Sequence, residues 1–278
     1  LGPSLRKVDP RNRLSTVMVT KRQPFCVTGS GRSGSTYLYL VLREHPKIAM
    51  TNESKLVDFI MLSAKFGRIP AYAVDEEMQM QGMCNPDYIP DFCPLYERHA
   101  REAWEEFYDV HFAHKDFTHW GDKMVSLSSA KDLYAHVPNM QFVVLVRDAR
   151  DVTCSLLKYL EKPELRETHH DIVDFSARQH AERWRDIYVD ILDNVPNYHL
   201  VRYEEVMADP KRQIESILGY MGLEMAPEVV QAIETNDTFR GHGTSSTREE
   251  SMGKWKKELS DQELQDIDEV CGAVMKKM

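Results

Sequence analysis

The chain has few cysteines, no long apolar run and no excess of positive charge, and each absence excludes a class of protein. Five cysteines in 278 residues, with no CxxC pair, argue against a disulfide scaffold and favour a reduced, cytoplasmic protein. No stretch approaches the roughly 18 apolar residues of a membrane span. A net charge of −9 disfavours nucleic acid as a partner, because its phosphates would be repelled.

Metal and subunit signals are also missing. The eleven histidines include no tight ligand pattern such as HExxH, so we predict no metal site. No segment specifies a subunit interface, and a homodimer stays open.

Short apolar runs alternate with amphipathic segments, which predicts an α/β protein. One domain, residues 1–278, is expected to hold a central parallel sheet with helices on both faces. Strands are predicted at 24–30, 47–50, 141–148 and 198–206. Helices are predicted at 36–44, 54–66, 96–113, 151–160, 175–193, 211–221, 226–234 and 260–278, the last with Ser260 as N-cap.

Two segments do not fit this alternation. Residues 1–22 form a polar lead-in. Residues 71–120 are rich in methionine and proline, and we interpret them as an insertion that shapes an acceptor pocket. An ordinary surface insertion with methionine as filler is the alternative interpretation.

A glycine-rich turn, Gly29 to Thr36, joins the first predicted strand to the first predicted helix. Such a turn directs backbone N–H groups and the positive end of the helix dipole toward an anion. We therefore predict that this loop binds phosphate or sulfate.

Two nucleotide-binding patterns overlap in the loop. Gly29-x-Gly31-x-x-Gly34, with Glu53 further on, matches a dinucleotide fingerprint, so an NAD(P)-dependent oxidoreductase is one alternative. The spacing also fits an NTP-binding loop, but Ser35 stands where the essential lysine would be. The cation of Arg32 beside a hydroxyl suits a highly charged transferring group better than it suits a dinucleotide or an NTP.

Three elements resemble the sulfotransferases. GSGRSGST is similar to their 5'-phosphosulfate loop, in particular that of the tyrosylprotein and carbohydrate enzymes. Residues 142–155 resemble their 3'-phosphate element, a strand followed by R-D-x-R-D and a serine. Arg248-x-x-Ser251-x-Gly253-x-Trp255 is similar to their C-terminal phosphate-closing segment, although two glutamates replace the usual Lys and Gly.

The resemblance implies a P-loop-like fold and the donor 3'-phosphoadenosine 5'-phosphosulfate, with 3',5'-adenosine diphosphate as the product. A nucleotide-binding module without activity is a further alternative. The resemblance assigns donor binding to Arg32, Ser33, Gly34, Ser35, Thr36, Arg147, Ser155, Tyr203 and Arg248.

The resemblance also implies which residues are catalytic. Glu53 lies 21 residues after Arg32, where the tyrosylprotein enzymes have their glutamate base, whereas Val125 replaces the histidine base of the cytosolic branch. Lys123 resembles the lysine that neutralises the transferring group, and Arg32 is expected to hold that group. The acceptor is expected to be a hydroxyl or amine of a small molecule, including natural products, or of a carbohydrate or a peptidyl tyrosine.

Overall fold

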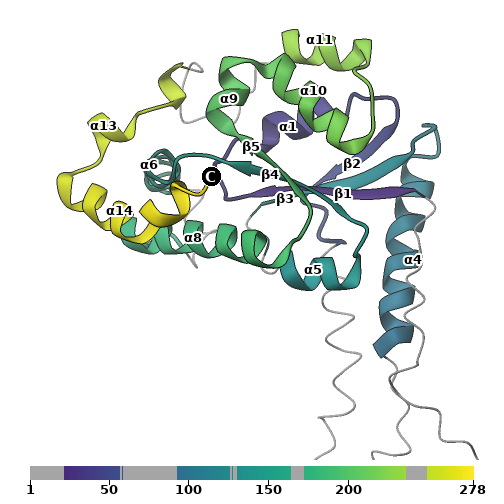
Figure 1. The fold of residues 1–278 in the computed structure, drawn as a ribbon, viewed down its shortest axis with the longest axis horizontal. Helices are drawn as coiled ribbons and strands as arrows, with labels where there is room; N and C mark the ends of the chain where they lie inside the picture. Colours follow the sequence, from purple (N-terminus) through teal and green to yellow (C-terminus); the bar gives the residue numbers. More distant parts are fainter. Residues whose placement is uncertain are drawn as a thin grey trace, which may run out of the picture.

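Five buried strands form one parallel sheet in the order β2-β3-β1-β4-β5 (Figure 1). A computed structural model describes residues 22–56, 58, 93–125, 127, 130–163, 172–235 and 249–278. The strands are β1 (Gln23–Gly29), β2 (Ile48–Asn52), β3 (His119–Val125), β4 (Gln141–Val146) and β5 (Tyr198–Arg202). The four predicted strands are thus confirmed, and β3 was not foreseen.

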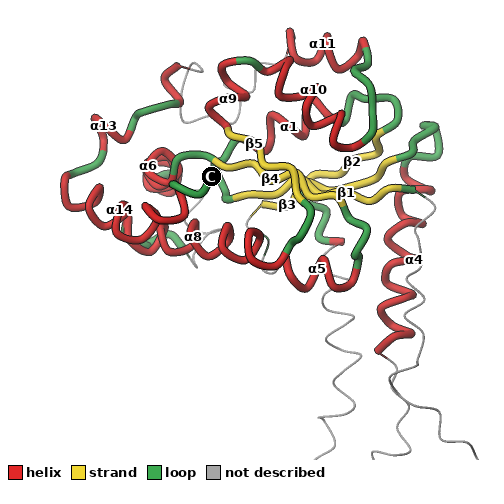
Figure 2. Tube along the Cα trace, viewed as in Figure 1, coloured by secondary structure: helices red, strands yellow, loops and turns green. Residues whose placement is uncertain are grey.

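Helices cover both faces of the sheet, as the predicted α/β fold requires (Figures 1 and 2). One face carries α1 (Ser35–Leu42), α9 (Tyr203–Ala208), α10 (Pro210–Met221) and α11 (Pro227–Thr235). The other carries α4 (Cys93–His111), α5 (Ala130–His136), α6 (Ala149–Leu160), α8 (Ala177–Asn194) and α14 (Asp261–Met275). A 3₁₀ turn, Glu249–Ser251, and α13 (Trp255–Glu258) precede α14.

Alternate residues of the central strands face opposite layers. On β1, Phe25 and Val27 pack against the α1–α10 layer, whereas Cys26 packs against the α8 layer. On β4, Val143 packs against the α1–α10 layer and Val144 packs against the α8 layer. This period of two in a continuously apolar strand is what a sheet covered on both faces requires.

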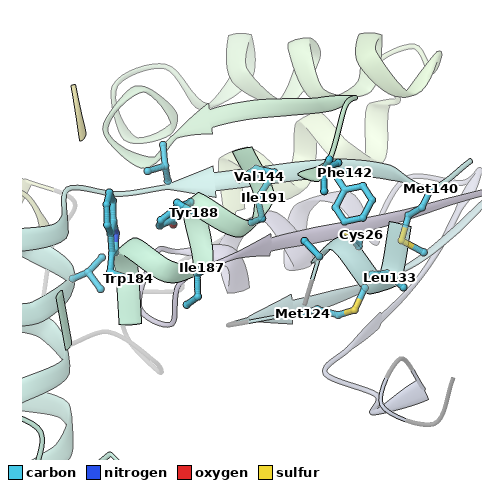
Figure 3. Close-up of a cluster of buried hydrophobic side chains, with 14 of the residues drawn as sticks. Cys26, Met124, Leu133, Met140, Phe142, Val144, Trp184, Ile187, Tyr188 and Ile191 are labelled. Carbon is cyan, nitrogen blue, oxygen red and sulfur yellow. The ribbon is translucent and has the colours of Figure 1, made fainter. Parts of the chain in front are cut away.

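Helix α8 is the principal support beneath the sheet. Trp184, Ile187, Tyr188 and Ile191 project from it into the buried cluster under β4 (Figure 3). Its N-terminus has a capping box formed by Ser176 and Gln179.

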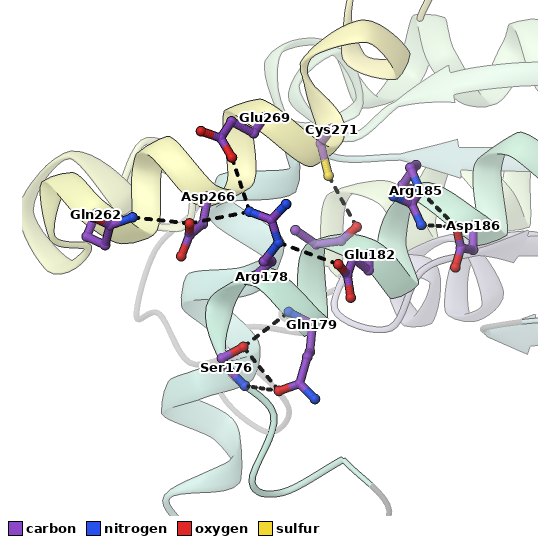
Figure 4. Close-up of polar contacts among 11 residues, drawn as sticks. Ser176, Arg178, Gln179, Glu182, Arg185, Asp186, Gln262, Asp266, Glu269 and Cys271 are labelled. Carbon is purple, nitrogen blue, oxygen red and sulfur yellow. Dashed lines mark hydrogen bonds and ion pairs between the residues drawn. The ribbon is translucent and has the colours of Figure 1, made fainter.

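Helix α14 is tied to α8 by polar contacts. Arg178 lies 3.5 Å from Asp266 and 3.1 Å from Glu269, and the Cys271 thiol donates to the Ala181 carbonyl at 3.2 Å (Figure 4). Ser260 caps α14 with Glu263, as predicted. The C-terminal helix therefore fixes α8 from outside.

The interpretation of residues 71–120 needs a correction from residue 93 onward. Trp104 and Tyr108 of α4 are buried and pack against Trp120, with ring centroids 4.9 and 5.0 Å away. The expected helix at 96–113 is therefore part of the core, and β3 begins at His119 inside the sheet. Residues 71–92, most of the helix expected at 54–66, and residues 1–21 lie outside the described part of the chain.

Of the helices that the structure describes, none combines the length and the apolar character needed to span a membrane.

Gly121 of β3 provides a test of the sheet. A Cβ atom there would lie 2.2 Å from the Phe25 carbonyl oxygen, so Gly121→Ala should destabilise the protein by about 1–3 kcal/mol or more in urea unfolding. In the control Gly219→Ala in α10, a Cβ meets nothing within 4 Å, and we expect a gain of about 0.5–1 kcal/mol. An unchanged midpoint for Gly121→Ala would contradict the tight β1–β3 contact.

Candidate active site

The carboxyl ends of β1, β2, β3 and β4 meet at one cavity of about 530 Å³. Ligands of open parallel α/β sheets bind in the crevice at this edge. Most of the predicted site residues line it, namely Arg32, Gly34, Ser35, Thr36, Glu53, Lys123, Arg147, Ser155 and Tyr203. Ser33 is fully buried in the loop itself, and Arg248 lies outside the described residues.

The glycine-rich loop needs glycine at two positions for different reasons. At Gly29 the chain passes so close to β4 that a Cβ would lie 2.2 Å from the Leu145 carbonyl oxygen. Gly34, the residue before α1, has φ +94°, and a Cβ there would meet the Tyr203 ring at 2.6 Å. The first turn of α1 has neither an acidic residue nor a side-chain cap, which leaves its positive end open to an anion.

Tyr188 of α8 contacts the glycine-rich loop at Ser30. Its hydroxyl accepts from the Ser30 N–H at 3.1 Å and donates to the Leu145 carbonyl at 2.7 Å. Burial raises the pKa of this phenol to about 12, so it stays a neutral donor. No sequence pattern pointed to Tyr188, because nothing in a helix pattern links it to a loop 158 residues away.

Two arginines bring positive charge into the cavity. Arg147 donates to the Arg32 carbonyl at 2.8 Å and to the Ser251 carbonyl, and its guanidinium lies 4.6 Å from the Tyr203 ring centroid. Arg32 donates to the Ser155 hydroxyl at 3.3 Å. Burial, together with the charge of Arg147, lowers the pKa of Arg32. Two cations that interact in one cavity favour an anionic ligand there.

Arg147 Nε is buried and has no hydrogen-bond partner within the described chain, and the same is true of Ser33 Oγ in the loop. Buried donors are normally paired. An anionic ligand with several acceptor oxygens fits the chemistry of this set.

Glu53 and Lys123 meet as an ion pair. Lys123 Nζ lies 2.5 Å from Glu53 Oε1, with the lysine side chain 4% and the glutamate side chain 44% exposed. The Glu53 N–H donates to the Lys123 carbonyl at 3.0 Å, which extends the β2–β3 ladder by one residue. The carboxylate therefore lies at the open side of a buried cation.

The turn that presents Glu53 is strained and is held by Asp122. Glu53 and Lys55 both have positive φ, +52° and +64°, which is uncommon for residues with a Cβ. Between them, Ser54 donates to Asp122 Oδ2 from its N–H at 3.0 Å and from its hydroxyl at 2.6 Å. Asp122 is fully buried, and this burial raises its pKa. Asp122 is thus a positioning residue that the sequence did not reveal.

Tyr203 and the 3₁₀ turn line one side of the cavity. The Tyr203 hydroxyl and the Ser251 hydroxyl lie 2.7 Å apart. Asp151 Oδ2 accepts from the Gly253 N–H at 2.8 Å, and Trp255 stacks on Arg150 at 4.1 Å. Tyr203 begins α9 and does not continue the strand predicted at 198–206, because β5 ends at Arg202.

Within the described ranges, no three metal-ligating side chains gather at one place. His119 lies at the opposite end of β3 from Lys123 and bonds the Met221 carbonyl at 2.9 Å.

Comparisons with known proteins identify the family and the fold. A model of the sulfotransferase family matches residues 24–227. The chain therefore belongs to the sulfotransferase family, whose activity is sulfuryl transfer, and the oxidoreductase alternative is set aside. A search of curated proteins found no match.

Three solved structures share the fold. The sulfotransferase domain of the curacin biosynthetic pathway is 14% identical, with a TM-score of 0.60 over 92% of this chain and 98% of that one. The sulfotransferase domain of the Synechococcus PCC 7002 olefin synthase is 16% identical, with a TM-score of 0.50 over 91% and 96%. Sulfotransferase STF9 from Mycobacterium avium is 13% identical, with a TM-score of 0.53 over 94% and 78%.

Acid should destabilise the protein, because His45, His119 and His180 have pKa values lowered by burial, that of His180 to about 4. Because each imidazole is harder to protonate in the folded state than in the unfolded state, unfolding takes up protons below about pH 6.5, and stability falls as the pH falls. His180 alone should contribute a loss of about 2 kcal/mol between pH 7 and pH 5.

Urea unfolding at both pH values measures this loss. His180→Gln should flatten the pH dependence, whereas the exposed His114→Gln should not. The same slope in His180→Gln and the unaltered protein would show that His180 does not titrate on unfolding.

Proposed function

We propose that this sulfotransferase uses 3'-phosphoadenosine 5'-phosphosulfate and transfers its sulfuryl group to a hydroxyl or amine of a small acceptor. The observation that carries the proposal is one cavity in which a glycine-rich anion loop, the half-buried Arg32, the buried Arg147 and the Glu53–Lys123 pair converge. An anion loop alone would suit many nucleotides. A base and a cation beside it suit group transfer.

The donor fits the polar half of the cavity. The first turn of α1, with Arg32, Ser35 and Thr36, is suited to the 5'-phosphosulfate. Arg147 and Ser155 are suited to the 3'-phosphate, because both follow β4 and face the same cavity. Tyr203 packs against Gly34 and orders the loop between these two sites.

Glu53 and Lys123 perform complementary parts of the reaction. Glu53 accepts the proton of the acceptor O–H or N–H while that atom forms its new bond to sulfur. Lys123 stabilises the negative charge on the 5'-phosphate oxygen that leaves with the electron pair of the broken S–O bond. Arg32 holds the sulfonate oxygens between these two groups. The resulting displacement needs no metal and no covalent intermediate with the protein.

Donor binding can be tested without an acceptor. Calorimetry should show binding of 3',5'-adenosine diphosphate, and Arg147→Ala should weaken it about 10- to 150-fold through loss of charged hydrogen bonds. Arg43→Ala is the control, because Arg43 is exposed and paired with Glu44. Binding of NADH without binding of the adenosine diphosphate would overturn the proposal.

The catalytic pair can be tested with any acceptor found by screening with sulfur-labelled donor. Glu53→Gln should lower kcat about 10²- to 10⁴-fold, and Lys123→Met should also lower it, while nucleotide affinity changes little. Glu44→Gln and Lys47→Met are matched controls, because both residues form ion pairs outside the cavity. Unchanged kcat in Glu53→Gln would remove Glu53 as the base.

A further inference from the structure

A second half of the cavity wall lies along α6, α8 and the segment before α8, and Ser155 is its one residue assigned to the donor. Apart from Ser155 and Tyr159, which contact Arg32, the side chains of this half are mostly aliphatic. The aliphatic side chains are those of Val152, Leu156, Leu160, Ile172 and Ile187. A polar half joined to an apolar half is the usual composition of a site for a small organic ligand.

His180 stands out in this apolar wall. It is 1% exposed, and neither ring nitrogen has a hydrogen-bond partner among the residues that the structure describes. Its nearest ring neighbour is Phe175, 5.5 Å away between centroids. Buried polar side chains are nearly always paired, and leaving two nitrogens without partners is costly. An unpaired buried imidazole in a cavity wall is therefore a candidate to hydrogen-bond a ligand in that cavity.

The imidazole is uncharged, because burial lowers its pKa to about 4 and the nearby charge of Arg183 acts in the same direction. A neutral ring offers one N–H donor and one nitrogen acceptor. A hydroxyl or an amide matches both, whereas an ammonium group would lie near Arg183.

The position of His180 relative to the donor site is also fixed by contacts of α8. One turn further along α8, Trp184 Nε1 donates to the Arg147 carbonyl at 3.1 Å. One turn earlier, the capping box of Ser176 and Gln179 begins the helix, and Arg178 ties it to α14 (Figure 4). The separation between His180 and the transfer site is therefore set by rigid structure.

We propose that the α6–α8 half of the cavity binds the apolar body of the acceptor and that His180 hydrogen-bonds a second, neutral polar group of the same molecule. The inference rests on the proposed function, and it selects the acceptor class: a small amphipathic molecule with a hydroxyl or amine to be sulfated and a hydroxyl or amide at the other end.

Four phenols of similar length serve as probes, added to protein saturated with 3',5'-adenosine diphosphate. They end in a neutral amide (N-acetyltyramine), a methyl group (4-butylphenol), a carboxylate (3-(4-hydroxyphenyl)propionate) and an ammonium group (tyramine). Calorimetry should show the amide binding about three- to tenfold more tightly than the methyl compound, the range of one neutral hydrogen bond. Both charged compounds should bind more weakly than the amide.

Variants of His180 test whether its imidazole causes the preference for the amide compound. His180→Leu should abolish the advantage of the amide over the methyl compound, and His180→Gln should retain part of it. His119→Leu is the matched control, a buried histidine at the far end of β3 whose loss should lower stability without altering selectivity. Unchanged affinity for the adenosine diphosphate shows that each variant is folded.

The ¹⁵N resonances of the His180 ring provide a second measurement that needs no variant. Addition of N-acetyltyramine should shift them as a neutral ring gains hydrogen bonds, and 4-butylphenol should not.

The outcomes separate the inference from the proposed function. A preference for the carboxylate, an amide advantage that survives in His180→Leu, or no binding by any phenol would overturn the inference while leaving donor binding intact. Failure of the adenosine diphosphate to bind would instead refute the proposed function, and the inference with it.

Discussion

Arg147 is the residue on which the arrangement of the site depends. Placed directly after β4, it donates to the Arg32 carbonyl in the loop and to the Ser251 carbonyl in the C-terminal turn, while its own carbonyl accepts from Trp184 of α8. Its guanidinium also lies over the Tyr203 ring. One buried cation thus connects the loop, the sheet, the helix beneath it and the segment that closes over the cavity. These contacts concentrate charge where an anion would complete the network.

Several energetically unfavourable features of the described residues lie at this same edge of the sheet. Arg32, Glu53 and Lys55 have positive φ there, and Asp122 and Lys123 are buried although charged. Such strain and burial persist only where the surroundings enforce them. The apolar layers on both faces of the sheet supply that enforcement, since β1 and β4 are buried along nearly their whole length. Stability comes from the layers, and the site is built where their strands end.

Apolar patterning identified four strands and most of the described helices, because burial on both faces demands continuous apolar runs. β3 was not predicted, and the reason is chemical. It contains Gly121, Asp122 and Lys123, which do not resemble a buried strand, yet all three are buried between β1 and β2. Glycine is needed there for close approach to Phe25, and the two charged residues serve the site. Function thus obscured the secondary-structure signal where it mattered most.

By itself the sequence determined the local chemistry: a strand, glycine turn and helix that form an anion-binding loop, an arginine at the end of a second strand, and an acid 21 residues after Arg32. Local chemistry is readable because backbone geometry follows from neighbouring residues. Only the tertiary structure decided that Asn52 pairs with Lys123, which places Glu53 against a cation 70 residues away. It likewise brought Tyr188 behind the loop and His180 into the cavity wall. Those contacts depend on strand order and helix packing, which no local pattern specifies.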